Sequence, residues 1–200
     1  MARAGLDRAQ VVATAAQIAD AEGVDAVTLA RVAGALGIKS PSLYNHVGGR
    51  DDLLRGVGLL GLSEIAAALR EAAIGRAGTE GLVATAGAYR SYVLAHPGRY
   101  AAGAVTAAAP DDDELRDAGA AVLDVLRGVL RGWSLDDEET IHALRALRSA
   151  VHGFASLEAA GGFGIKLDLD TSFDRLIRTL AAGLDQGNPA GSALVEEGGA

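Results

Sequence analysis

The chain has 200 residues and a net charge of −8; half of its residues are apolar, 4% are aromatic and none is cysteine. The lack of cysteine excludes disulfides and thiolate metal sites, and it favours a reducing cytoplasm as the compartment. The N-terminal residues are polar, and no apolar run reaches the ~18 residues of a membrane span, so we expect neither a secretion signal nor a membrane helix.

Helical periodicity dominates the chain, and we expect an all-α fold of about nine helices without useful β-alternation. Ala and Leu, both strong helix formers, supply much of the apolar content. In the first helix Val11, Ala15, Ile18 and Ala19 recur on one face, and Gly23 ends it. The expected helices span about residues 7–22, 28–36, 40–47, 49–73, 79–96, 98–108, 111–132, 134–160 and 171–185.

Residues at the helix ends predict where three of these helices begin. Thr28 is a good N-cap for the second helix, which Gly37 ends. Ser40 is expected to cap the third helix, with Pro41 at the first helical position, where a missing N–H costs nothing. Thr171 is expected to cap the last helix.

Two short helices joined through Gly37 and Ile38 have the dimensions of a helix-turn-helix. If Leu43 and Val47 face the core, a step of about 100° per residue turns the polar side chains of the third helix outward. The start of this helix at Ser40 also presents backbone N–H groups that suit a phosphate. On spacing alone, an ordinary helical hairpin with a polar outer face fits as well.

The expected outer face of the third helix carries small or polar side chains and no negative charge, as a polyanionic partner requires. Pro41, Ser42 and Asn45 point outward, and Tyr44 and His46 flank them. Base edges and phosphates could both be reached from this face.

Charge is distributed unevenly along the chain. Residues 1–55 hold six basic and six acidic side chains, so residues 56–200 carry the whole net charge. The segment 26–50 has no acid, yet it contains Arg31, Lys39 and Arg50. Such a window favours binding of a polyanion, although chance in a biased composition would also produce it.

Residues 28–53, which read TLARVAGALGIKSPSLYNHVGGRDDL, closely resemble the N-terminal signature of the tetracycline-repressor (TetR) family of bacterial regulators. The resemblance implies a DNA-binding, dimeric transcription regulator, usually a repressor that a small-molecule effector releases from a near-palindromic operator. It implies that Tyr44 and Arg50 mostly reach phosphates, and that Ser42, Asn45 and His46 lie nearest the bases. The expected DNA-binding residues are Thr28, Arg31, Lys39, Ser40, Pro41, Ser42, Tyr44, Asn45, His46 and Arg50.

Two positions depart from the family signature. Many members have Arg where this chain has Ala30, and here the Arg follows one place later, at Arg31. A shift of about 100° around the helix aims Arg31 at a different phosphate or at none. Lys39 replaces a residue that is usually small, and it could add a contact.

The C-terminal part resembles one subgroup of the same family, named for a Trp-His-Gly motif. The similarity lies in the stretch Leu147–Phe154 and in short pieces after it, with Val151 in the place of the Trp. We therefore expect residues 1–50 to bind DNA, residues 51–188 to bind ligand and dimerise, and residues 189–200 to form a flexible tail. The predicted homodimer interface uses the last two helices, about residues 137–160 and 171–185, paired with their two-fold mates.

The resemblance also implies a small-molecule cavity among the helices after the head. Pockets favour aromatic groups with a few polar handles, and such side chains are scarce in this Ala-rich body. For each of these side chains, packing in the hydrophobic core is at least as good an explanation. The candidate effector-binding residues are Tyr89, Tyr92, His96, Trp133 and Phe154.

No constellation typical of an enzyme is present, so we expect neither catalysis nor a cofactor or metal. The glycine-rich run 161–164 follows a helix and is better explained as a loop than as a phosphate cradle. His142 and His152 stand ten residues apart, a spacing that does not let them share a metal easily. The acidic run 111–114 is interpreted as solvated helix-capping charge, not a calcium loop.

Overall fold

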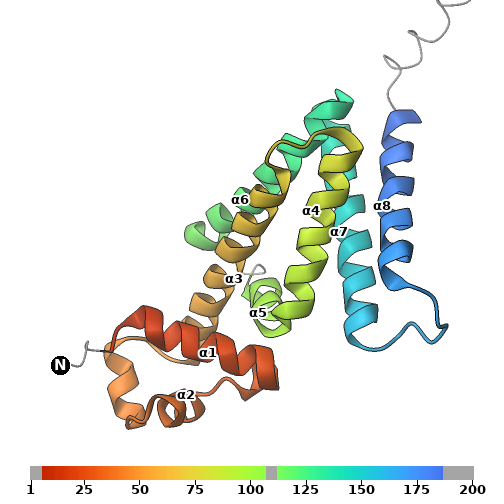
Figure 1. Ribbon diagram of the computed structural model, residues 1–200. Coiled ribbons are helices and arrows are strands. Elements are labelled where there is room, and N and C mark those ends of the chain that lie inside the picture. Colours follow the sequence, from red (N-terminus) through yellow and green to blue (C-terminus); the bar gives the residue numbers. More distant parts are fainter. Residues whose placement is uncertain (1–5, 107–111, 187–200) are drawn as a thin grey trace, which may run out of the picture. The chain divides into compact units, whose positions relative to one another are not determined.

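The structure is a computed structural model that describes residues 6–106 and 112–186, and the predicted tail at residues 189–200 lies outside them. Within these ranges every regular element is a helix, as predicted (Figure 1). The α-helices are α1 (Arg8–Glu22), α2 (Leu29–Leu36), α3 (Arg50–Ala73), α4 (Gly78–Ala95), α5 (Pro97–Thr106), α6 (Asp113–Leu130), α7 (Asp137–Ala159) and α8 (Leu169–Gln186). The 3-10 helices are η1 (Val24–Ala26), η2 (Ser40–Asn45) and η3 (Arg131–Trp133).

Both predicted ends of α2 are confirmed, and α1 begins with a further cap. Asp7 and Gln10 form a reciprocal capping box at the start of α1. Thr28 caps α2, since its hydroxyl accepts a hydrogen bond from the N–H of Arg31 at 3.1 Å. Gly37 ends α2 with a left-handed φ of 67°.

Two predicted caps and one predicted helix start are wrong. Ser40 is the first residue of η2 and makes no side-chain cap. The helix expected to open at residue 134 begins at Asp137, because Asp136 supplies the cap and Ser134 adopts a left-handed φ of 51°. Thr171 lies inside α8, and it is Asp168 that accepts a hydrogen bond from the Thr171 N–H, at 2.8 Å.

The chain forms two compact units, Met1–Ile65 with Ala95–Ala121, and Ala66–Leu94 with Val122–Ala200. The core of the first unit joins α1, α2, η2 and the first half of α3, and α5 packs on α1. Gly98 makes this packing possible, because a Cβ added there would lie 2.0 Å from the carbonyl carbon of Ala19.

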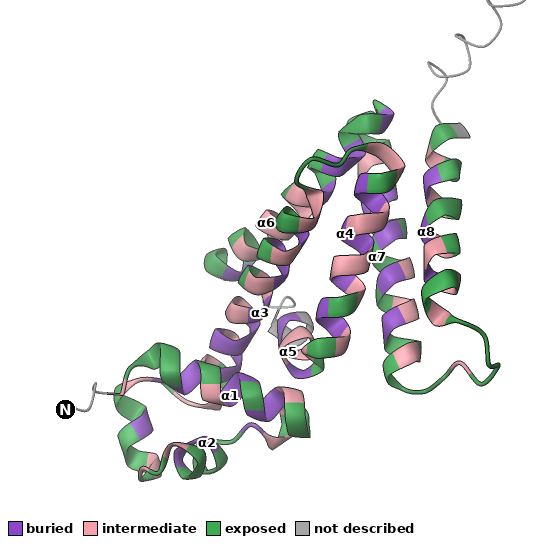
Figure 2. Cartoon of the chain, in the orientation of Figure 1, coloured by how far each residue is buried: buried purple, intermediate pink, exposed green. Residues whose placement is uncertain are grey.

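The second unit buries large side chains from α4, α6, η3, α7 and α8, and α7 and α8 lie side by side (Figures 1 and 2). Arg90 of α4 connects the last two helices. Its guanidinium donates to both carboxylate oxygens of Glu158 at 2.6 Å and to one carboxylate oxygen of Asp170 at 2.8 Å. The same cation lies 5.3 Å from the ring centroid of Phe154 and 5.0 Å from that of Phe173. No described helix combines the length and apolar character needed to cross a membrane.

Candidate nucleic-acid interface

The second and third helical segments of the first unit have helix-turn-helix order. Gly37 ends α2, and η2 begins at Ser40 with Pro41 in its first turn. The predicted inward pair is confirmed: Leu43 is fully buried and Val47 is 2% exposed. Their burial fixes which side of η2 faces outward.

The third segment is a 3-10 helix instead of the expected α-helix. With three residues per turn, side chains three apart lie above one another, so Ser42 aligns with Asn45 and Pro41 with Tyr44. All four are exposed, and Tyr44 is 62% exposed. The outward face that the sequence predicted is therefore present, although its columns follow a period of 3.0 and not 3.6.

The remaining predicted contact residues differ in how accessible they are. Thr28, Arg31 and Lys39 are exposed. Ser40, His46 and Arg50 are only partly exposed. The hydroxyl of Thr28 is already used as a helix cap, so it would reach DNA from a fixed position.

Arg50 and Arg31 both have protein partners. The guanidinium of Arg50 donates to the backbone carbonyls of Val27 at 2.8 Å and Val24 at 3.2 Å, which ties the start of α3 to the segment before α2. Arg31 binds Glu22 at 2.6 Å, and this contact lowers the pKa of the Glu22 carboxyl. Either guanidinium would have to share or exchange these partners in order to bind a phosphate.

Sequence reasoning missed a cluster that holds the end of η2. Arg8 of α1 donates to the carbonyl of His46 at 2.9 Å and to both carboxylate oxygens of Asp52 at 2.7 and 2.8 Å. Asp52 also accepts the N–H of Gly48 at 2.8 Å. The hydrogen bonds from Arg8 and then Gly48 lower the pKa of Asp52 to about 2.

Arg8 and Asp52 are 44 residues apart, so no local pattern pairs them. Asp52 also lies in the first turn of α3, where a negative charge is favourable to the helix dipole. In the structure Asp52 also fixes the turn that follows η2.

The candidate effector residues are distributed over the two units. His96 belongs to the first unit, where its Nδ1 lies 3.2 Å from a carboxylate oxygen of Asp20. In the second unit Tyr89 and Tyr92 are buried side chains of α4, and the indole N–H of Trp133 donates to Asp185 of α8 at 2.6 Å.

Phe154 packs in a different aromatic cluster of the second unit. Its ring centroid lies 4.7 Å from that of Phe163 and 5.1 Å from that of Phe173. These contacts, with Arg90 beside two of the rings, give Phe154 a packing role in this structure.

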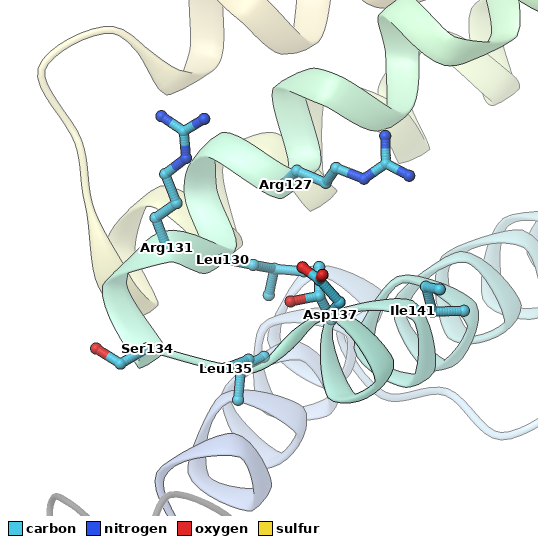
Figure 3. Close-up of a pocket in the computed structure, with 8 residues that line it drawn as sticks. Arg127, Leu130, Arg131, Ser134, Leu135, Asp137 and Ile141 are labelled. Carbon is cyan, nitrogen blue, oxygen red and sulfur yellow. The ribbon is translucent and has the colours of Figure 1, made fainter.

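A surface pocket of about 490 Å³ lies where η3 leads into α7, and none of the candidate effector residues lines it. Its wall combines apolar Leu130, Leu135 and Ile141 with charged and hydroxyl groups. The guanidinium groups of Arg127 and Arg131 extend in different directions (Figure 3), so they do not form one anion clamp.

The fold and the outward face of η2 define a helix-turn-helix DNA-binding protein, and comparison with known proteins agrees. Residues 11–57 match the family described as bacterial regulatory proteins, tetR family. Residues 82–180 match a tetracyclin repressor-like C-terminal domain. The chain belongs to the TetR family of transcription regulators and is not an enzyme.

Relatives of known sequence support this assignment over most of their length. An uncharacterized HTH-type transcriptional regulator, Rv0681 of Mycobacterium tuberculosis, is 37% identical over 92% of this chain and 84% of its own. YobS of Bacillus subtilis, another uncharacterized HTH-type regulator, is 31% identical over 91% of this chain and 94% of its own. Regulators of this family bind operator DNA, dimerise and bind small-molecule effectors.

Solved structures share the fold. A Rhodococcus sp. RHA1 protein of unknown function has a TM-score of 0.77 and 25% identity, over 90% of this chain and 95% of its own. Apo ActR of Streptomyces coelicolor has a TM-score of 0.66 and 26% identity, over 93% of this chain and 100% of its own. A TetR variant of Acinetobacter baumannii AYE in complex with minocycline has a TM-score of 0.69 and 20% identity, over 92% and 99%.

The C-terminal match includes the stretch Leu147–Phe154, in which the sequence resembled the Trp-His-Gly subgroup. The matched description names no subgroup, so that finer assignment stays a prediction.

Proposed function

We propose that this chain is a cytoplasmic, dimeric repressor that binds a near-palindromic operator and leaves it when a small-molecule effector binds. The observation that carries the proposal is the exposed, acid-free face of η2, with Ser42, Tyr44 and Asn45 held outward by the buried Leu43. A polyanion favours such a surface, and base edges can be reached from its short polar side chains.

In this proposal residues 1–50 form the DNA-binding part, and η2 enters the major groove. Ser42, Asn45 and His46 meet base edges, and Tyr44 meets a phosphate. Lys39 and Ser40 contact the DNA backbone at the start of η2. Two heads then occupy successive major grooves about 34 Å apart.

Residues 51–188 dimerise and bind the effector in this proposal. The outward face of α7 supports the predicted interface, because the apolar side chain of Ile141 is 44% exposed there. On α8 the half-buried Leu176 and Leu180 leave apolar surface for a partner helix. Paired with their two-fold mates, α7 and α8 would form a four-helix bundle.

An effector would act by binding more tightly to one spacing of the two heads than to another. The four candidate aromatic residues of the second unit are the proposed starting set for locating its site. His96 is a separate candidate, because in the free protein it lies beside Asp20.

Binding of the purified protein to its own upstream DNA tests the DNA-binding proposal. Tyr44→Ala should weaken binding at least about tenfold while the protein stays a dimer by light scattering. Loss of the dimer in this variant, or no sharp complex with any genomic fragment at low salt, would refute the assignment of η2.

A matched pair of charge removals separates phosphate contact from general charge. Lys39→Ala should make the salt dependence of binding shallower by about one unit of slope. Arg116→Ala also removes one exposed cation, but Arg116 lies on α6 beside Asp113, so the slope should not change. Equal slopes in both variants would exclude Lys39 from the interface.

A further inference from the structure

Three large apolar side chains at the end of α7 and in the loop before α8 face water. Leu157 is 52% exposed, Ile165 80% and Leu167 73%, and we call this group the loop patch. Among the described residues the other exposed large apolar side chains are Tyr44, Ile74 and Ile141. The loop patch therefore places three exposed apolar side chains within eleven residues, and Figure 2 colours most of the loop between α7 and α8 as exposed.

The loop that carries the patch is anchored on both sides. The N–H of Gly162 donates to the carbonyl of Leu157 at 2.7 Å, and the ring of Phe163 packs on Phe154. At the other side Asp168 accepts a hydrogen bond from the N–H of Thr171. Asp170, in the first turn of α8, accepts a hydrogen bond from Arg90. Ile165 and Leu167 are thus held outward by a fixed backbone, and a patch of this kind marks an interaction surface.

We propose that a second copy of this chain covers the loop patch in the dimer. The inference rests on the proposed α7–α8 interface, because the loop joins those two helices. Residues 159–165 carry no charge and Lys166 is the one cation of the loop, which suits apolar contact better than a strongly charged partner. A two-fold interface brings the same surfaces together from both copies, so the loop patches of both copies are buried in the dimer.

Thiol reactivity tests the proposal directly, since the native chain has no cysteine. Ile165→Cys and Ile74→Cys form a matched pair: both isoleucines are exposed in the single chain, at 80% and 72%, but Ile74 lies at the turn between α3 and α4. In the native dimer the thiol introduced by Ile165→Cys should react at least about tenfold more slowly than the thiol introduced by Ile74→Cys. In urea the two thiols should react at the same rate. Equal rates in the native dimer would overturn the proposal.

Charged substitutions supply an independent measurement. The double variant Ile165→Glu with Leu167→Glu should raise the dimer dissociation constant about tenfold or more, because two apolar contacts per copy are lost. Ile74→Glu should leave it unchanged. A slow thiol at position 165 with an unchanged dimer would mean that something other than a second copy covers the loop, and would refute the proposal.

The outcomes also separate this inference from the proposed function. If Ile141→Glu weakens the dimer and the loop variants do not, the α7 interface stands and the loop patch is excluded from it. If the native protein is a monomer at micromolar concentration, the dimeric repressor and the loop contact both fail.

Discussion

The guanidinium of Arg8 and the carboxylate of Asp52 form a two-pronged ion pair, with N–O distances of 2.7 and 2.8 Å, across the end of η2. One further hydrogen bond from Arg8 holds the His46 carbonyl, and Asp52 holds the Gly48 N–H. The turn after η2 is thereby fixed from α1 on one side and from α3 on the other.

Arg8→Met should weaken operator binding several-fold without changing the dimer, because it frees the backbone beside His46. Loss of the pair should also lower the free energy of unfolding by only about 1 kcal/mol, since Arg8 is 43% exposed. Fluorescence anisotropy with operator DNA and urea unfolding measure the two effects. Arg127→Met removes a comparable exposed pair on α6 and should leave DNA binding unchanged.

Stability should fall in acid between about pH 4 and pH 2. The pKa of Asp52 is lowered to about 2 by Arg8 and Gly48, and that of Asp112 is lowered to about 2, first by the hydrogen bond from Arg55. Because the folded-state pKa lies below the unfolded value, the ionised carboxylate stabilises the fold above about pH 4, and this contribution disappears as pH falls through the folded pKa.

Asp52→Asn and Asp112→Asn should each make the fall in stability with decreasing pH less steep. Urea midpoints measured between neutral pH and about pH 2 will show this. Asp117→Asn is the control, because Asp117 is an exposed acid on α6. A profile as steep in both test variants as in the native protein would contradict the assignment.

Gly98→Ala should destabilise the protein by about 2 kcal/mol or more, because the added Cβ collides with the backbone of Ala19 at the end of α1. Gly87→Ala is the matched control: Gly87 also lies in a helix, but an added Cβ meets nothing within 4 Å. That change should be neutral or stabilise the protein by about 0.5–1 kcal/mol. Similar unfolding curves for the two variants would show that α5 does not approach α1 this closely.

Arg90→Lys should lower the free energy of unfolding by about 1–2 kcal/mol, because an ammonium cannot replace the two-pronged contact with Glu158 or the contact with the two phenylalanine rings. Arg178→Lys tests the same exchange at an exposed site, where Arg178 binds Asp174 and Glu80. No measurable change is expected there. Equal effects at both positions would mean that the burial of Arg90 is unimportant.

Glu22→Gln should strengthen DNA binding modestly and steepen its salt dependence, because it releases Arg31 from its carboxylate partner. Adding Arg31→Ala to this variant should cancel the gain. Glu71→Gln, which removes an exposed acid of the second unit, controls for net charge. A gain that survives Arg31→Ala would exclude Arg31 from phosphate contact, and would settle the consequence of its shifted position.

The helices were predictable because their signals are local. Apolar residues recur at helical spacing, and Thr28 and Gly37 each act within a few residues of their own position. The helix expected from residue 134 begins three residues later, because Asp136 supplies the cap and Ser134 adopts a left-handed φ. The family signature covered the segment with the most specific spacing, and it predicted the class of protein.

The details of the candidate site depended on contacts between distant residues. The outward face of η2 follows from Leu43 and Val47, which are close in sequence. The pairing of Arg8 with Asp52, and of Arg50 with the carbonyls of Val24 and Val27, joins residues 23 to 44 positions apart. No periodicity encodes such pairs, so the sequence assigned Arg50 to DNA and left Arg8 without a role.

Trp133 gives the protein a built-in optical reporter. It is the only tryptophan of the chain, it is 4% exposed, and its indole N–H is bonded to the Asp185 carboxylate. A negative charge beside an indole shifts its emission, so the fluorescence spectrum reads the junction of η3 and α8. An effector that disturbs this junction would shift the emission wavelength of Trp133 without any attached dye. An event confined to the first unit would leave the emission spectrum unchanged.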